Sequence, residues 1–433
     1  MDAARIDDVR LWQALDSRGN PTIAAAVVAG SGRGQALAPA GASAGSHEAI
    51  FIRDGAGHRY DGRSVRAHAE RVHGNVREAL IGVDAADPQA VDSALRTLDP
   101  DPQLASIGGN VGTAVSIAAW LAAADAAGLE PWMWLARAVG RRPTIPMPMV
   151  NIISGGAHAG SMIDIQDILV VPIGADCFSD AIEWCWRARA GTRAVLDEMG
   201  FVTALVADEG GLAAAFDSDE RAIEAVVAGV QRAGLRPGID MSIALDVAAT
   251  ECQVPGGYRM LGGVVDSGTF VDRIMRWRER YPIVSIEDGA GEDDDVGWAR
   301  LAALCADTQV LGDDRYVTTV TRMRLGMQRA EANAVLVKPN QAGTLGQALQ
   351  VVANALDADW APVVSARSGE TEETWLADLA TGTAAGQIKV GSTMRSERTA
   401  KWNRLLYLEQ AHELDYAGPQ ALAPRGNRVG GSQ

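Results

Sequence analysis

A series of charged residues at regular intervals most strongly limits what this sequence can fold into. Each member ends a short run of apolar residues and precedes a stretch with helical character; the members are Glu209, Asp246, Glu287, Asp313, Lys338, Arg367 and Lys389. Consecutive members lie roughly 22 to 41 positions apart, the length of one strand and one crossover helix. The strand ends of a barrel meet at one rim, so the sequence predicts an α/β barrel with these charges gathered at one site.

The first part of the chain lacks this rhythm and predicts a separate α+β cap domain, residues 1–140. We expect strands at Leu11–Leu15 and Thr22–Val28, joined by a turn, and helices at Ser64–Leu80 and Gly109–Ala127. A chain of 433 residues exceeds one compact core, which agrees with two domains.

The barrel domain is predicted to span residues 141–422, beginning with a proline-rich junction at 141–148. Within it, apolar residues recur at helical spacing over Ser218–Leu235, with Asp217 or Ser218 as the helix cap. The expected strands are short apolar runs at Ile165–Pro172, Ala204–Ala207, Met241–Leu245, Ile283–Ile286, Val310–Leu311, Ala334–Val337 and Pro362–Val364. Residues 423–433 show no apolar pattern, and we expect a mobile tail there.

Charge and composition narrow the functional class. A formal charge of −16 argues against binding to nucleic acid or to an acidic membrane. The four cysteines form no CxxC pair, and the N-terminus lacks the pattern of a signal peptide. The longest apolar stretch, Thr113–Ala124, is too short to span a bilayer. We therefore expect a cytoplasmic protein with reduced thiols.

Three carboxylates on successive strand ends predict a metal site. Asp246, Glu287 and Asp313 would repel one another unless protons or a cation neutralised them. Oxygen-only ligation suits a hard cation such as Mg²⁺. The alternative is that individual carboxylates pair with lysine or arginine at the rim.

The lysines, Glu209 and Arg367 predict proton transfer next to a carboxylate. A partly desolvated lysine near a metal and a second cation has a lowered pKa, so Lys338 or Lys389 is a candidate general base. Glu209, beside two glycines, is the candidate general acid on the opposite side. Arg367 and Ser368 offer a clamp for a phosphate or carboxylate, unless Arg367 pairs with the neighbouring Glu370.

His158 is the histidine best placed for function. It lies in a glycine-rich segment, Ser154–Gly160, where a side chain is poorly placed for core packing and well placed to close over a ligand. The chain has no glycine-rich dinucleotide motif, no phosphate-binding GxxxxGK[ST] motif and no HExxH zinc motif.

Long motifs over nearly the full length resemble those of the enolase (phosphopyruvate hydratase) family. They are DSRGNPT, HEA, RDG, NIISGGAHAG, ADEGG, PIVSIED, GDD, LVKPNQAGTLGQ, SGETEET, QIKVG and RSERTAKWNRLL. The resemblance implies a small N-terminal α+β domain and a barrel whose first strands are arranged atypically.

The resemblance also implies roles for individual residues. It assigns Mg²⁺ ligation to Asp246, Glu287 and Asp313, the base to Lys338 and the acid to Glu209. Substrate contacts fall to Gln166, Arg367, Ser368, Lys389 and Ser43, and further active-site positions to His158 and Asp167.

Several positions depart from the family pattern. Ala40 stands where the family has a loop serine that helps hold a second Mg²⁺, and Ala366 stands where the family has a histidine. Asp167 replaces a glutamate, and Gly289 replaces a proline. These changes fall on the side of the phosphate and the departing hydroxyl, whereas the residues for removing an α proton are kept.

This pattern leaves three hypotheses open. The first is a Mg²⁺-dependent lyase that acts on a 2-phosphoglycerate-like hydroxy acid, with an altered phosphate side. The second is an enzyme of the carboxyphosphonoenolpyruvate synthase type, from phosphonate natural-product biosynthesis, which takes a phosphonate-bearing carboxylic acid. The third is a non-catalytic structural or binding relative, which would leave the lysines and metal ligands free to drift.

The same comparison predicts a homodimer with an altered interface. Enolases commonly pair a glutamate on an N-terminal strand with arginines of the partner. The matching positions here are Ala24, Trp12 and Tyr407, which favour a less polar interface.

Overall fold

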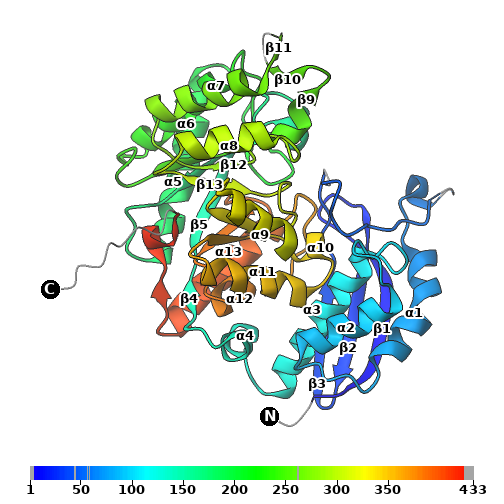
Figure 1. Ribbon diagram of the computed structural model, residues 1–433. Helices are drawn as coiled ribbons and strands as arrows, with labels where there is room; N and C mark the ends of the chain where they lie inside the picture. The colour runs from blue at the N-terminus through cyan, green and yellow to red at the C-terminus, as the bar shows by residue number, and fades with distance from the viewer. Residues whose placement is uncertain (1–3, 43–44, 56, 58, 261–262, 424–433) are drawn as a thin grey trace.

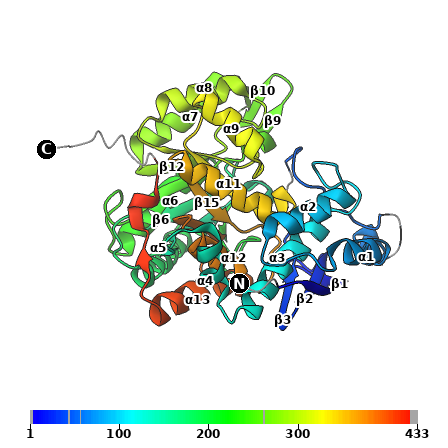
Figure 2. The same cartoon turned by 60° about the horizontal axis from the view of Figure 1, so that its bottom comes forward.

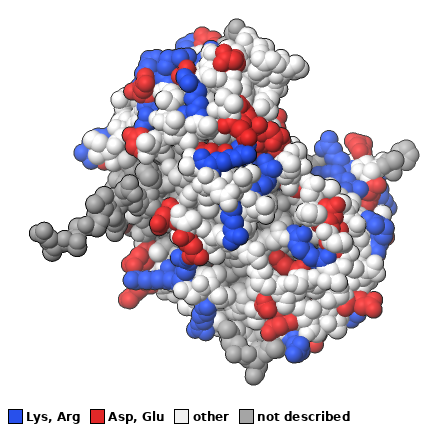
Figure 3. Space-filling view, in the orientation of Figure 1, with Lys and Arg blue, Asp and Glu red and all other residues white. Residues whose placement is uncertain are grey.

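The computed structural model describes residues 4–42, 45–55, 57, 59–260 and 263–423. Figure 1 shows the N-terminal domain, in blue and cyan, beside a larger domain that contains the rest of the chain. Over the face in Figure 3, acidic and basic side chains are interspersed.

The N-terminal domain is an antiparallel sheet covered by helices. Its strands are β1 (Ile6–Leu15), β2 (Pro21–Ala29) and β3 (Gly32–Leu37), in that spatial order. Its helices are α1 (Arg66–Leu80), α2 (Pro88–Leu98), α3 (Gly109–Ala126) and α4 (Pro131–Val139), with a short 3₁₀ turn, η1, at Arg59–Gly62. The predicted strands and the helices α1 and α3 are therefore present, and the α+β cap domain is confirmed.

Helix α3 lies unusually close to the sheet, and glycine makes this possible. A Cβ atom added at Gly34 would lie 2.0 Å from the carbonyl oxygen of Ala118, so only glycine fits. The small side chains of the alanines on α3 also allow this close approach, which explains the Ala-rich sequence of the helix.

The larger domain contains a closed barrel of eight strands. The strands are β5 (Met147–Ser154), β6 (Asp167–Val171), β8 (Ser242–Asp246), β12 (Ile283–Glu287), β13 (Gln309–Gly312), β14 (Ala334–Val337), β15 (Ala361–Ser365) and β16 (Gln387–Gly391). Strand β6 runs antiparallel to both neighbours, β5 and β8, whereas the remaining pairs are parallel and β16 closes on β5. The expected barrel with atypical first strands is confirmed.

Helices surround this barrel. They are α5 (Phe178–Glu198), α6 (Asp219–Arg232), α7 (Ser267–Arg280), α8 (Asp295–Leu304), α9 (Val320–Arg329), α10 (Pro339–Ala342), α11 (Leu345–Asp357), α12 (Trp375–Gly382) and α13 (Ser396–Ala411). Helix α6 begins where predicted, because the Ser218 hydroxyl accepts a hydrogen bond from the backbone N–H of Arg221. Figure 2 shows α4 beside α12, where the chain passes from cap to barrel.

Short strands, 3₁₀ turns and the chain end complete the domain. They are β4 (Thr144–Ile145), β7 (Leu212–Ala213), β9 (Gln253–Val254), β10 (Gly257–Met260), β11 (Gly263–Val265), β17 (Asp415–Tyr416), η2 (Gly156–His158), η3 (Ala249–Cys252) and η4 (Gly418–Ala421). Ala423 is buried and donates its backbone N–H to Gln309, so the barrel extends at least to this residue. The rest of the predicted tail lies outside the described residues.

Two sequence expectations differ from the structure. The run Ala204–Ala207 is no barrel strand: Val206 forms one isolated bridge, and Leu205 is exposed, so apolar composition there does not mark a buried segment. Lys389 lies in the middle of β16 instead of closing it.

Within the described ranges, no single helix is long and apolar enough to cross a membrane. The pair α3 and α4 passes that test by length and composition, but it is bent by 98°.

Candidate active site

Most of the predicted site residues meet at the carboxyl ends of the barrel strands. Asp246 and Glu287 are the last residues of β8 and β12, and they pair directly in register. Asp313 and Lys338 follow β13 and β14 without a gap. The cavity between them is small, with a volume of about 30 Å³, and is lined by Gly41, Ala42, His158, Gln166, Glu209, Asp246, Ala248, Asp288, Asp313, Asp314, Lys338, Ser365, Ala366, Arg367, Ser368 and Lys389.

Lys389 holds two of the carboxylates together. Its Nζ atom lies 2.7 Å from Asp246 Oδ2 and 2.7 Å from Glu287 Oε2. Burial lowers the pKa of Lys389, but Asp246 and Glu287 outweigh burial and raise that pKa well above its usual value. Burial raises the pKa of Glu287, and the Asp246 charge adds to this.

Lys338 forms the second lysine–carboxylate pair. Its ammonium group donates to Asp313 Oδ2, and Gln341 Nε2 donates to Asp313 Oδ1 at 2.8 Å. Burial lowers the pKa of Lys338, but Asp313 reverses the shift, so the pKa is raised. The lowered pKa that we expect for this lysine beside a bound metal stays a prediction.

His158, Asp167 and Glu209 form a second group of interacting side chains at the site. His158 Nδ1 lies 2.8 Å from Asp167 Oδ2, and His158 Nε2 lies 3.9 Å from Glu209 Oε1. Burial lowers the pKa of His158, but Asp167 and then Glu209 raise it to about 9. The imidazole is therefore protonated at neutral pH and holds the pKa of Glu209 below its usual value against the effect of burial.

Asp167 and Gln166 are anchored by polar neighbours. Asn151 donates to Asp167 Oδ1 at 2.5 Å, and burial raises the pKa of Asp167 against the effect of His158. Gln166 donates to Asp246 Oδ2 at 3.1 Å. Asp167 and Asp246 also pair in register across β6 and β8. The group that contains His158 and the group around Lys389 are therefore held by neighbouring strands.

Arg367 is oriented by an acid from the cap domain. Its Nη1 and Nη2 atoms lie 2.9 and 3.2 Å from the two carboxylate oxygens of Glu48. The alternative partner, Glu370, instead pairs with Lys401 at 2.9 Å, and it accepts the backbone N–H groups of Arg367 and Thr371.

Ser368 and the segment from Ala40 connect cap and barrel. Ala40 forms two backbone hydrogen bonds with Gly369, of 2.8 and 2.9 Å. Arg18 donates to the carbonyl oxygens of Ala40 and Gly41 and to Ser368 Oγ, which holds the start of the loop against the site. Ser43, the predicted substrate contact on this loop, lies outside the described residues.

The departures from the family pattern occupy defined places. Ala366 is buried and lines the cavity next to Arg367. A Cβ atom added at Gly289 would lie 3.0 Å from side-chain atoms of both Ile286 and Leu301, so the position is tightly packed.

The carboxylates present a setting that fits a hard cation. Glu287 Oε1 is buried and has no hydrogen-bond partner among the described residues, so it is an oxygen without a donor. The ligand atoms of Asp288, Asp313 and Asp314 lie within 4.8 Å of one another, as do those of His158, Asp167 and Glu209. The oxygens of Asp246, Glu287 and Asp313 do not form so compact a group, and the two lysines provide the neutralising charges.

Sequence reasoning missed three residues that shape this site. Glu48 and Gln341 orient Arg367 and Asp313, and Asp288 accepts the backbone N–H groups of Asp313 and Asp314 at 2.9 and 2.7 Å. Glu48 and Gln341 belong to the HEA and KPNQ motifs, which was the available signal. Asp288 directly follows a predicted ligand.

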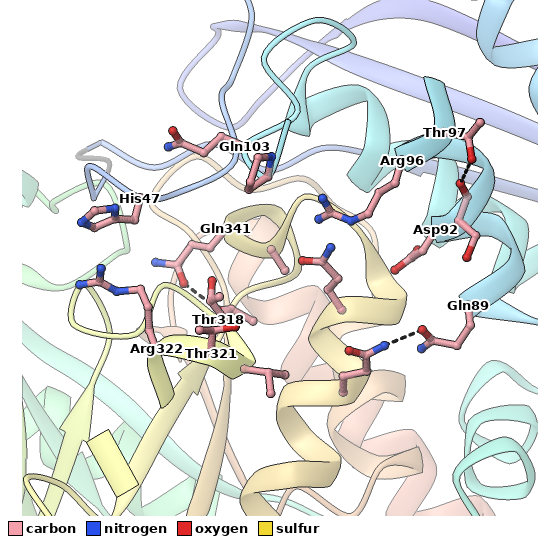
Figure 4. A pocket seen from close by; sticks show the side chains of 17 residues that line it. His47, Gln89, Asp92, Arg96, Thr97, Gln103, Thr318, Thr321, Arg322 and Gln341 are labelled. Atoms are coloured by element: carbon pink, nitrogen blue, oxygen red, sulfur yellow. Dashed lines mark hydrogen bonds between the residues drawn. The ribbon is translucent and has the colours of Figure 1, made fainter. Parts of the chain in front are cut away.

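A larger cavity lies elsewhere, between α2, α9 and α11, with a volume of about 910 Å³. Figure 4 shows Arg96 and Asp92 on its one side and Arg322 and Gln341 on the other. Gln341 and Thr318 connect this cleft to the described site, because Gln341 donates to Asp313 and the Thr318 hydroxyl accepts the backbone N–H of Lys338. The strand-end cavity, where the charged groups converge, is the candidate active site.

Comparison with known protein families agrees with this geometry. The model of the enolase N-terminal domain matches residues 6–135, and the model of the enolase C-terminal TIM barrel domain matches residues 142–424. Together they take in both structural domains and the strand ends that carry the site. The chain belongs to the enolase family.

Proposed function

We propose that this protein is a Mg²⁺-dependent lyase that removes the α proton of a 2-phosphoglycerate-like hydroxy acid and forms an enolpyruvate product. The observation that carries the proposal is that two buried lysines contact Asp246, Glu287 and Asp313 at one barrel rim. Membership of the enolase family supports a lyase and a small phosphorylated carboxylic acid as substrate.

The groups divide into an acidic and a basic side. In this proposal, Lys338 takes the α proton of the substrate. Lys389 binds the substrate carboxylate, which is attached to the carbon that loses this proton. Glu209, with its carboxyl group near His158, faces the departing hydroxyl from the opposite side. Arg367 and Ser368 bind the phosphate, with Gln166 and Asp167 as further contacts on the acidic side.

Asp246, Glu287 and Asp313 would hold the Mg²⁺. When bound, the cation would supply positive charge that acidifies the α position. The buried, unpartnered Glu287 Oε1 supports this assignment.

The alternative function, a carboxyphosphonoenolpyruvate synthase-type reaction, is favoured by one observation. Ala366 and Ala40 lack the family's imidazole and hydroxyl next to Arg367, on the side where a larger phosphorus-containing group would lie. A non-catalytic role does not account for the retained lysine and carboxylate pairs.

We also propose a homodimer. Trp12 and Tyr407 are exposed by 37% and 52%, as an apolar interface requires. Ala24, in contrast, is fully buried beneath its own sheet neighbours, so it contributes no contact to a partner. Sedimentation at micromolar concentration tests this, and a monomer would contradict it.

Product formation separates the enzymatic functions. The protein is incubated with 2-phosphoglycerate and Mg²⁺, with and without phosphonoformate, and products are followed by ³¹P NMR. Phosphoenolpyruvate without the addition supports the lyase, whereas a new carbon–phosphorus product that requires phosphonoformate supports the synthase. No product and no exchange of the α proton under either condition would exclude both.

A further inference from the structure

One buried guanidinium contacts two segments that present functional groups to the candidate active site. Arg398 lies on α13, within the RSERTAKWNRLL motif, and its side chain is 0% exposed. The two segments are residues 208–209, here the Glu209 segment, and residues 367–368, here the Arg367 segment. The described residues that line the strand-end cavity do not include Arg398, so any effect that it has on the reaction passes through other groups.

Arg398 donates hydrogen bonds to the backbone of the Arg367 segment. Its Nη1 atom lies 2.6 Å from the carbonyl oxygen of Arg367, and its Nη2 atom lies 2.5 Å from that of Ser368. Nη1 also donates, at 3.0 Å, to the carbonyl oxygen of Val390, which directly follows Lys389 on β16. A planar guanidinium holds its donors in a fixed fork, so these contacts fix the backbone from which the side chains of the Arg367 segment project.

The same guanidinium reaches the Glu209 segment. Nη2 lies 3.5 Å from the carbonyl oxygen of Asp208, and the carbonyl oxygen of Glu209 accepts the backbone N–H of Ser392 at 2.8 Å. A Cβ atom added at Gly391 would lie 2.8 Å from the Glu209 oxygen and 3.1 Å from the Cδ of Arg398, so the end of β16 packs tightly against both. Arg398 therefore contacts the Glu209 segment and the Arg367 segment together.

Arg398 also acts on the site through its charge. The acid that pairs with it is Glu397, whose Oε1 atom lies 3.5 Å from the Nε of Arg398 and 2.7 Å from the Nε of Arg395. Burial raises the pKa of Glu209, but His158 and then Arg398 lower it, and the result lies below its usual value. Arg398 thus contributes both charge and hydrogen bonds, and a lysine in its place would separate the two.

We propose that Arg398 is a positioning residue that fixes the Glu209 carboxyl group, on the side of the departing hydroxyl, at a set distance from the Arg367 segment, which binds the phosphate. The inference rests on the proposed function, because it takes these two roles from it. Lys338 follows a different strand, β14, so removal of the α proton provides an internal reference for elimination.

Arg398→Lys tests the proposal, because lysine keeps the charge and offers one nitrogen in place of the fork. The first quantity measured is the ratio of phosphoenolpyruvate formation to α-proton exchange, by NMR, with saturating 2-phosphoglycerate and Mg²⁺ in D₂O. The second is the Kd of phosphoenolpyruvate, by calorimetry. Arg404→Lys is the matched control, since Arg404 lies on the same helix and pairs with Asp378 and Glu130, which do not line the strand-end cavity.

We expect Arg398→Lys to lower the ratio by about tenfold or more and to raise the Kd by about tenfold, because a displacement of about 1 Å at a reacting group costs about 100-fold in rate. Arg404→Lys should leave both quantities unchanged. A folded Arg398→Lys in which either quantity stays at its wild-type value overturns the inference. Equal changes in Arg398→Lys and Arg404→Lys also overturn it, because a merely structural role would produce them.

A measurement on the wild type decides if Arg398→Lys does not fold, as judged by circular dichroism. The crystal structure with Mg²⁺ and phosphoenolpyruvate should keep the contacts of Arg398 to the carbonyl oxygens of residues 208, 367 and 368 while Glu209 and Ser368 contact the ligand. Loss of the contacts to either segment overturns the inference.

The wild type also separates failure of this inference from failure of the proposed function. Proton exchange and product formation by the wild type, with an unchanged ratio in Arg398→Lys, leave the proposed function standing and overturn the positioning role. Neither exchange nor product in the wild type contradicts the proposed function and overturns both.

Discussion

Asp92 provides a quantitative test of how the cap domain is joined to the barrel. It lies on α2, is 5% exposed, and its Oδ2 accepts a hydrogen bond from the Thr344 hydroxyl next to α11, while Oδ1 has no hydrogen-bond partner in the part of the chain that the structure describes. Burial raises the pKa of Asp92 from 3.8 to about 6, against smaller opposing effects of Thr344 and Arg96.

The sign of the pH dependence follows from this shift. The folded state binds the Asp92 proton more tightly than the unfolded state, so its contribution to stability is fully present below pH 3.8 and is lost as pH rises to about 6. The complete loss is about 3 kcal/mol, since one pKa unit corresponds to about 1.36 kcal/mol. Roughly half of that loss, about 1.4 kcal/mol, falls between pH 5 and pH 8.

Asp92→Asn removes the titration and keeps an acceptor for Thr344. We expect its free energy of unfolding, relative to that of the wild type, to increase by about 1.4 kcal/mol from pH 5 to pH 8, because only the wild type loses stability over this range. Urea denaturation at the two pH values measures this, with the exposed Ser93→Ala on the same helix as control. A difference between Asp92→Asn and wild type that does not change with pH would refute the reasoning.

Three further predictions concern the site. Glu48→Gln leaves the buried Arg367 guanidinium without its acid, so the free energy of unfolding should fall by about 3 kcal/mol; the loss should shrink when 2-phosphoglycerate is present, and an equal loss with and without the ligand would contradict the pairing. Mg²⁺ at 100 times its Kd should stabilise the wild type by about 2.7 kcal/mol and so raise its thermal midpoint. Differential scanning fluorimetry measures this midpoint, and Asp246→Asn should abolish the increase. Ala366→His should raise the rate of 2-phosphoglycerate dehydration, followed by absorbance, by at least about tenfold relative to α-proton exchange; a dehydration rate that stays the same would show that the missing imidazole is not what limits elimination.

The barrel and its rim could be predicted because strand geometry fixes them. Asp246, Glu287, Asp313 and Lys338 each end or follow a buried apolar run, and parallel strands bring such positions together. The same rule misread Ala204–Ala207, because an apolar run in a surface loop has the composition of a strand without its burial. Whether such a run forms a strand depends on tertiary contacts, which its composition does not reveal.

The contacts that cap-domain residues make with the site could not be predicted from local sequence patterns. Glu48 and Arg367 are 319 positions apart, and Arg18 reaches Ser368 over 350 positions, so no periodicity connects them. Likewise, the raised pKa of Lys338 depends on one contact with Asp313, which the sequence placed at the same rim without specifying the pair.

Exchange of the α proton of 2-phosphoglycerate in D₂O with Mg²⁺, compared between the wild type and Lys338→Ala by ¹H NMR, tests the central claim most directly. We predict exchange by the wild type that stops when Mg²⁺ is chelated and that falls by about 10² to 10⁴ in Lys338→Ala, a variant whose circular dichroism spectrum should be unchanged. Exchange at the wild-type rate in folded Lys338→Ala would contradict the account.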